Sequence, residues 1–335
     1  MTKNKSGVVN IMFQVRTDLA IEAREIYEQR NKSEIKDIEI DKEEKEYYNV
    51  TRVKILNDHG EKRLGKPIGT YITIEVPALK SADQDLKDEI SKAMAKELKA
   101  LINPDKHTKS LIVGLGNWNI TPDALGPKVI DKVYVTRHLF KAYNKTEDED
   151  MTEVSAISPG VMGITGIETS ETIKGIVEKT NPDIVIAVDA LASRKMERVS
   201  TTIQITDAGI SPGSGIGNER KALNKEYLGV PVYAIGIPTV VDAATMINDT
   251  MELIIEELKN QADEGTSFYS MLEEMESQDK YQLIKEVLTP YMPNVVVTPK
   301  EIDELISNLS LIVANGLNIA LHHGIDLNDV NRYIN

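Results

Sequence analysis

Two aspartates, each at the end of an apolar run, have residue types and positions that could do chemistry. Asp123 lies in the stretch that begins with Leu111 and reads LIVGLGNWNITPD, and Asp189 ends the run DIVIAVD. In an α/β sheet, the carboxyl ends of neighbouring strands meet in one crevice, where ligands bind. Two carboxylates in one crevice cannot both ionise freely, so one of them holds a proton. The pair therefore predicts an acid and a base, in a chain that has no cysteine to act as a nucleophile.

The elements that must position these aspartates follow a βαβα rhythm from about residue 110 onward. Continuous apolar runs of strand length predict buried strands, and helical periodicity follows them. This alternation predicts an α/β fold with a doubly wound, mostly parallel sheet flanked by helices. The expected strands are 111–115, 184–188, 202–206 and 232–237, and the expected helices are 123–143, 169–180 and one from about 242.

The segments on either side of this core have patterns of their own. Alternating residues in 50–56 and 70–77 predict an N-terminal hairpin, and 262–295 reads as an acidic, Met-rich helical insertion. Capping signals predict where three further helices begin. These are a charged helix over 16–35 capped by Thr17 or Asp18, a helix from a Ser81 capping box to about Leu101, and an apolar helix after a Thr298 capping box, through Ile302 and on to Ile319.

Two glycine-rich segments follow expected strands. Gly114 and Gly116 lack the G-x-G-x-x-G spacing that opens a helix in a dinucleotide site, so they predict either a close approach of a substrate backbone or a plain tight turn. The glycines of 211–218 suit a loop whose amides could hold an oxyanion, or a simple connector. Each aspartate also has a purely structural alternative. Asp123 could only stabilise the N-terminus of a helix through the helix dipole, and Asp189 could only cap the next turn.

Composition excludes several classes of function. The 335 residues carry a net charge of −14, which disfavours non-specific binding to nucleic acid. The absence of cysteine excludes disulfides and thiolate metal sites and fits a reducing interior. The N-terminus lacks the apolar core of a signal peptide, and the apolar runs are of strand length rather than membrane length. We therefore expect a cytoplasmic protein with no membrane partner and no direct nucleic-acid partner.

Histidine and serine patterns argue against other hydrolases. The five histidines show no H-E-x-x-H spacing, so a zinc protease is disfavoured, and no serine lies in a G-x-S-x-G elbow. His138 is expected on a helix without a catalytic role, and His322 and His323 are expected in a turn after the last helix. We expect no cofactor, and the sequence leaves the participation of a metal open.

Five motifs together resemble the germination protease family of spore-forming bacteria, and the resemblance covers nearly the whole chain. They are VRTDLAIEA from Val15, GLGN from Gly114 with TPDALGP from Thr121, SPGVMGITG from Ser158, AVDALAS from Ala187, and DAGISPGSGIGN from Asp207. The resemblance implies an atypical aspartic endopeptidase with Asp123 and Asp189 as catalytic residues. It also implies a phosphorylase/hydrolase-like fold similar to that of the hydrogenase maturation proteases.

The family further implies a biological setting. Its members degrade small acid-soluble spore proteins during germination, assemble as homotetramers and are made in the forespore as zymogens that process themselves. The family's preference for an acid, then a hydrophobic residue, then alanine falls on Asp18, Leu19 and Ala20. We therefore expect a propeptide over 1–18, cleavage between Asp18 and Leu19, and a single peptidase domain over 19–335.

Two other functions stay open at this point. The run LIVGLGN also resembles the opening of peptidyl-tRNA hydrolases, although here it follows 110 residues and lies in an acidic chain. The protein could also be a non-enzymatic assembly or storage protein of the spore, with purely structural aspartates. Binding of tRNA would support the former, and failure to cleave any spore protein would support the latter.

Overall fold

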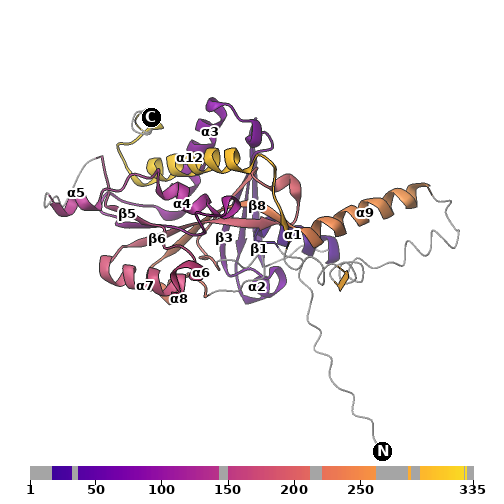
Figure 1. Ribbon diagram of the computed structural model, residues 1–335, viewed down its shortest axis with the longest axis horizontal. Coiled ribbons are helices and arrows are strands. Elements are labelled where there is room, and N and C mark those ends of the chain that lie inside the picture. The colour runs from indigo at the N-terminus through magenta and orange to yellow at the C-terminus, as the bar shows by residue number, and fades with distance from the viewer. Residues whose placement is uncertain are drawn as a thin grey trace, which may run out of the picture.

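A single mixed sheet with helices on both faces forms the body of the protein (Figure 1). The computed structural model describes residues 17–31, 37–142, 150–211, 221–261, 286–287, 295–327 and 329. The strand order is β1-β2-β3-β7-β8-β6-β4-β5, with β9 paired to β8. The strands are β1 Ile38–Glu44, β2 Asn49–Ile55, β3 Gly69–Glu75, β4 Ser110–Gly114, β5 Val154–Ile157, β6 Ile184–Ser193, β7 Thr202–Thr206, β8 Val232–Asp242 and β9 Val296–Val297.

The helices account for most of the remaining described chain. The α-helices are α1 Ala20–Asn31, α2 Asp58–Leu64, α3 Gln84–Ile102, α4 Leu125–Ile130, α5 Arg137–Ala142, α6 Met162–Thr165, α7 Thr169–Thr180, α8 Lys225–Leu228, α9 Ala243–Gln261 and α12 Ile302–Leu321. Short 3₁₀ turns are η1 Leu79–Ser81, η2 Thr121–Asp123 and η3 Met196–Arg198. The expected insertion over 262–295 and most of the expected propeptide lie outside the described residues.

The α/β class is confirmed, but the sheet is mixed. β8, β6, β4 and β5 run parallel to one another, as expected for the core of the chain. β7 pairs antiparallel to both β3 and β8, so it joins the parallel part to the N-terminal strands. The expectation of a mostly parallel sheet therefore holds for the half that carries the two aspartates. The predicted hairpin is confirmed as β2 and β3, with α2 in its connection and β1 added at its edge.

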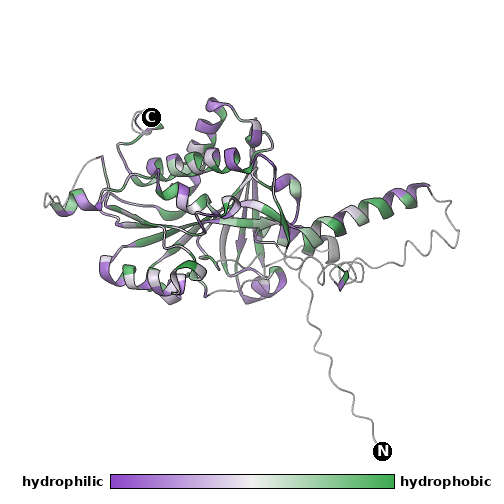
Figure 2. Cartoon of the chain, viewed as in Figure 1, coloured by the Kyte–Doolittle hydropathy of each residue, from purple (hydrophilic) through white to green (hydrophobic). Residues whose placement is uncertain are grey.

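Strand alternation divides the core into two layers, because successive side chains point to opposite faces. On one face Ile112, Ile186 and Val188 pack under α3, α4 and α12. On the other face Val113 and Ala187 pack against α7 and α8. The green faces of the helices in Figure 2 turn toward the sheet in both layers. The long apolar runs of β4 and β6 are explained by this burial on both faces.

Helix boundaries depart from the expected caps. The side chain of Asp83, and not Ser81, accepts the Leu86 N–H at the start of α3, at 2.9 Å. Thr298 does not cap α12, since its hydroxyl donates to the Thr239 carbonyl at 2.8 Å, and Glu301 is the residue before the helix. In the first segment a nearby aspartate takes the capping role, and in the second a tertiary contact draws Thr298 away and leaves the helix without a side-chain cap at Glu301.

The expected helix over 123–143 is wrong as one element. The chain forms η2, then α4, and then α5, with residues 131–136 between the two α-helices.

α12 is long and apolar enough to cross a membrane by length and composition. It packs against α3 and α4, and 72% of its most apolar stretch of 18 residues is buried. We therefore interpret α12 as a core helix, and its length corrects the expectation of strand-sized apolar runs.

Candidate active site at the carboxyl ends of β4 and β6

A glycine turn holds Asp123 at the end of β4. The Asn117 N–H donates to the Asp123 carbonyl at 3.0 Å. A β-carbon on Gly116 would lie 2.0 Å from that same oxygen, and Gly116 has φ +112°, a conformation that side chains disfavour. A β-carbon on Gly114 would likewise lie 2.4 Å from the carbonyl oxygen of Gly126. These glycines therefore allow the chain's own backbone to close on itself, which supports the tight-turn interpretation of this motif.

Asp189 lies in β6, directly after the last residue that pairs with β4. Its side chain is buried, with 5% of the residue exposed, and its Oδ1 accepts the Ala190 N–H at 3.0 Å. By strand alternation it shares a face with Ala187 and Leu191. The neighbouring strand β8 places Gly236 beside it in register. Asp189 is thus a buried acid on a rigid strand, whereas Asp123 is half-buried in a turn.

The structure brings the two aspartates to the same edge of the sheet. β4 and β6 are parallel neighbours whose last pair is Gly114 with Val188. The Leu115 N–H donates to the Val188 carbonyl at 2.8 Å, which continues the pairing by one residue. The turn η2, which carries Asp123, packs against β6 and β8. The topological expectation from the sequence is therefore confirmed for position, and the catalytic role of the two residues stays a prediction.

Exposed apolar side chains surround this edge. Trp118 and Ile120, in the connection from β4 to η2, are each 52% exposed. Met162 and Ile164 in α6 follow β5, the strand on the other side of β4, and are 47% and 62% exposed. Exposed apolar groups gathered beside polar ones are typical of binding surfaces. An extended peptide with apolar side chains would fit such a rim.

The residues expected at the processing site are buried against β6. Leu19 and Ala20 each have 0% of their surface exposed. Asp18 does not cap α1. Its carboxylate accepts the Ala192 N–H at 2.9 Å, and its own N–H donates to the Ala192 carbonyl at 3.0 Å. Sequence reasoning missed Ala192 as a partner, because no local pattern links residues so far apart in the chain.

Other sequence candidates take other positions. The glycine loop over 211–218 lies almost wholly outside the described residues. His322 directly follows α12, as expected, and is buried, accepting the Thr152 N–H at its Nδ1 and contacting the Tyr134 carbonyl through Nε2. Burial lowers the pKa of the His322 imidazole, with an opposing contribution from the Tyr134 carbonyl. Within the described part of the chain, no group of acidic and histidine residues could hold a metal ion.

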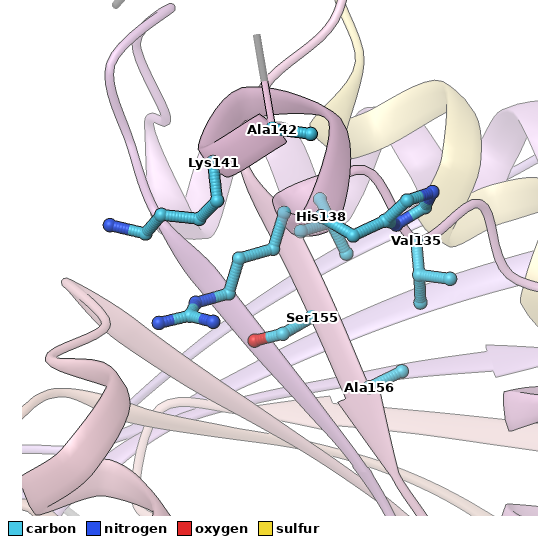
Figure 3. Close-up of a pocket in the computed structure, with 8 residues that line it drawn as sticks. Val135, His138, Lys141, Ala142, Ser155 and Ala156 are labelled. Atoms are coloured by element: carbon cyan, nitrogen blue, oxygen red, sulfur yellow. The ribbon is translucent and has the colours of Figure 1, made fainter. Parts of the chain in front are cut away.

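A basic depression of about 630 Å³ lies elsewhere, between α5 and β5 (Figure 3). Its lining includes Arg137, His138 and Lys141, together with Ser155 of β5. His138 is exposed on α5, as expected. Neither Asp123 nor Asp189 lines this depression, so it is separate from the candidate active site.

Comparisons with known proteins agree with these observations. A family model described as germination protease matches residues 17–267 and 256–334. A germination protease of Clostridium perfringens is 52% identical over 325 residues, covering 97% of this chain and 100% of the relative. One of Caldanaerobacter subterraneus is also 52% identical, covering 97% and 99%, and one of Bacillus mycoides is 43% identical, covering 96% and 97%. The chain therefore belongs to the germination protease family.

Proposed function

We propose that this peptidase of spore germination is an endopeptidase that starts the degradation of small acid-soluble spore proteins. Membership of the family supports a protease that acts in germinating spores. The observation that carries the mechanism is the placement of both aspartates where β4 ends: Asp123 lies in the turn that follows β4, and Asp189 is the first residue of β6 beyond its pairing with β4. This is the position at which ligands meet an open α/β sheet.

The two carboxylates divide the work of hydrolysis between them. Two negative charges at one edge of the sheet, one of them on the buried Asp189, are disfavoured, so in this scheme the pair shares one proton. The ionised member takes a proton from water as the water attacks the scissile carbonyl. The protonated member gives its proton to the leaving amine. Both assignments of acid and base satisfy this scheme.

Two N–H groups in the turn after β4 are not available to the developing oxyanion. The N–H groups of Leu115 and Asn117 are already bonded to Val188 and Asp123. A substrate carbonyl would therefore bind other amides, and the sequence offers Gly116 and the loop over 213–217 as candidates. Preorganised donors of this kind stabilise the charge that develops in the transition state.

The proposal includes a zymogen stage. Residues 1–18 are the propeptide, and cleavage between Asp18 and Leu19 activates the chain. Because Leu19 and Ala20 are fully buried, the bond must leave its place against β6 before a protease can act on it. Mildly acidic pH in the forespore is a suitable trigger, since protonation of a carboxyl pair responds to it. This setting places the protein in the spore core.

A homotetramer is the proposed assembly. α9 projects from the body (Figure 1), and several of its apolar side chains are exposed. Leu253, Ile254 and Leu258 are 67%, 54% and 39% exposed, whereas Ile255 is buried. A row of such side chains on one helix is typical of a surface that another copy covers. α9 is therefore the candidate contact between subunits.

Substitution of each aspartate tests the proposal. Asp123→Asn and Asp189→Asn should each abolish self-processing and cleavage of an acid-soluble spore protein, because asparagine can neither take nor give the proton. Circular dichroism and light scattering should show an unchanged fold and assembly. Intact mass and N-terminal sequencing after incubation at mildly acidic pH measure processing. Processing retained in both variants would refute the aspartate mechanism.

A further inference from the structure

The strand β6 extends beyond its neighbour β4, and the segment before α1 lies along the extension. Pairing with β4 ends at Val188, while β8 stays paired with β6 as far as Ser193. Backbone groups at alternate positions of β6 point toward the side where β4 has ended. The Ala192 N–H and carbonyl on that side bond Asp18, and the Arg194 N–H donates to Glu22 Oε2 at 2.7 Å. The N-terminal segment thus takes the place of a strand neighbour.

Asp18 is held in a way that uses its carboxylate. In a strand pair, a backbone carbonyl would accept the Ala192 N–H. Here Asp18 Oδ2 accepts that N–H at 2.9 Å, while the Asp18 N–H donates to the Ala192 carbonyl at 3.0 Å. The site therefore combines backbone pairing with recognition of an acidic side chain.

Two side chains bind the backbone carbonyls of the same segment. The Lys66 ammonium donates to the carbonyls of Thr17 and Asp18, both at 3.0 Å. Gln204, which is buried in β7, donates its Nε2 to the Asp18 carbonyl at 3.3 Å and accepts the Ala20 N–H at 2.7 Å. Burial lowers the pKa of Lys66, against the opposing influence of the Asp18 and Glu22 carboxylates. Hydrogen bonds from a charged donor are about twice as strong as neutral ones.

The residue after the acid enters an apolar contact. Leu19 is fully buried and packs with Ile21, Leu191 and Ile210. Leu191 belongs to β6 itself, on the same face as Asp189 by strand alternation. The segment at this site is therefore read as an acid and then an apolar residue, directly before α1 begins at Ala20. Strand addition with side-chain pockets is a general mode of peptide recognition.

We propose that the β6 edge from Ala190 to Arg194, with Lys66 and Gln204, is a binding site for an extended acidic peptide. Residues 17–19, which precede α1, occupy it in this chain as a tethered ligand. The site begins one residue after Asp189 and leads a peptide toward it. This inference rests on the proposed function for its meaning, because a protease needs such a groove beside its catalytic carboxylates. Its test is independent of hydrolysis.

The first experiment measures how firmly the tethered segment is held. Amide hydrogen exchange is followed in the full-length chain with Asp123→Asn, which prevents self-cleavage. Lys66→Met should accelerate exchange over residues 17–23 by about tenfold or more, because it removes charge-assisted bonds to two carbonyls. Lys62→Met, at an exposed lysine of α2, should leave exchange unchanged, and Lys66→Arg should retain most of the protection. Unchanged exchange in Lys66→Met would overturn the proposal.

The second experiment tests binding in trans. A fluorescein-labelled peptide with the sequence of residues 14–23 is titrated into the full-length Asp123→Asn chain that also carries Asp18→Ala. The substitution weakens the tethered segment, whose effective concentration is otherwise in the millimolar range. Fluorescence anisotropy should show saturable binding, and adding Lys66→Met should weaken it by about tenfold or more.

The outcomes separate this site from the catalytic proposal. A peptide that itself carries Asp18→Ala should bind about tenfold or more weakly than the parent peptide, because the Ala192 N–H loses its acceptor. Equal affinity for both peptides, or no saturable binding of the parent peptide, would refute the site. Loss of proteolysis in Asp123→Asn has no bearing on either result, so the two proposals fail separately.

Discussion

Replacement of Gly116 by alanine tests whether the glycine turn positions Asp123. The added β-carbon would lie 2.0 Å from the Asp123 carbonyl oxygen and 3.2 Å from its Oδ1. Ordinary van der Waals contact begins at 3.4 Å, so the two backbone segments must separate by about 1.4 Å, the difference between 3.4 and 2.0. The carbonyl also accepts the Asn117 N–H, so the same movement strains that bond.

The magnitude has two parts. A non-glycine residue held at positive φ costs about 1–3 kcal/mol, and overpacking adds about 1–3 kcal/mol. Small shifts of the surrounding backbone reduce both costs, so we expect the free energy of unfolding to fall by about 2–5 kcal/mol. A displacement of about 1 Å in a catalytic group can cost about 100-fold in rate. We therefore expect kcat/KM for a peptide substrate to fall by about 100-fold.

Urea unfolding and peptide hydrolysis at a temperature where the variant stays folded measure both quantities. Gly175→Ala is the matched control, because a β-carbon there meets nothing within 4 Å and the residue lies in the exposed middle of α7. That control should gain about 0.5–1 kcal/mol of stability and keep its activity. If Gly116→Ala matched the control in both measurements, the turn would not position Asp123 and the reasoning would be refuted.

Two other substitutions test the electrostatics away from the site. His322 has a folded-state pKa below its unfolded value, so its stabilising contribution is present above about pH 6.5 and is lost as pH falls below that value. His322→Gln should therefore flatten the decline in urea midpoint between about pH 7 and 5, and an unchanged decline would contradict the assignment. Arg198, whose side chain is 8% exposed, bonds Glu25 and Glu75, and its pairing lowers the pKa of Glu25 against the opposing effect of burial. Arg198→Met should cost about 2–4 kcal/mol, less than the loss from a fully buried pair because both carboxylates are partly exposed. Arg24→Met, which breaks an i,i+4 pair in α1, should cost about 0.5 kcal/mol. Equal costs for these two arginine substitutions in urea unfolding would contradict the analysis.

Much of the fold follows from local pattern. The apolar runs that predicted strands over 184–188, 202–206 and 232–237 are found in β6, β7 and β8, and the helix over 169–180 is α7. These segments are long and strongly periodic, so local pattern and tertiary burial agree. The caps expected at Ser81 and Thr298 are wrong for different reasons: Asp83 caps α3 in place of Ser81, whereas Thr298 bonds the Thr239 carbonyl and α12 begins without a side-chain cap at Glu301. β5 has only four residues, too few for an alternating or apolar pattern to predict a strand.

The sequence by itself determined that Asp123 and Asp189 each come after an apolar run of strand length, which in a parallel sheet predicts that both lie at one edge. Only the tertiary structure decided that β6 continues through Asp189 to Ser193. Only the tertiary structure decided that β7 runs antiparallel, because strand direction depends on partners distant in the chain. Only the tertiary structure placed Lys66, Gln204 and Ala192 around Asp18. Periodicity in the sequence indicates which face of a helix or strand is buried. The contact of the β6 edge and Lys66 with the segment before α1 depends instead on the packing of the whole chain.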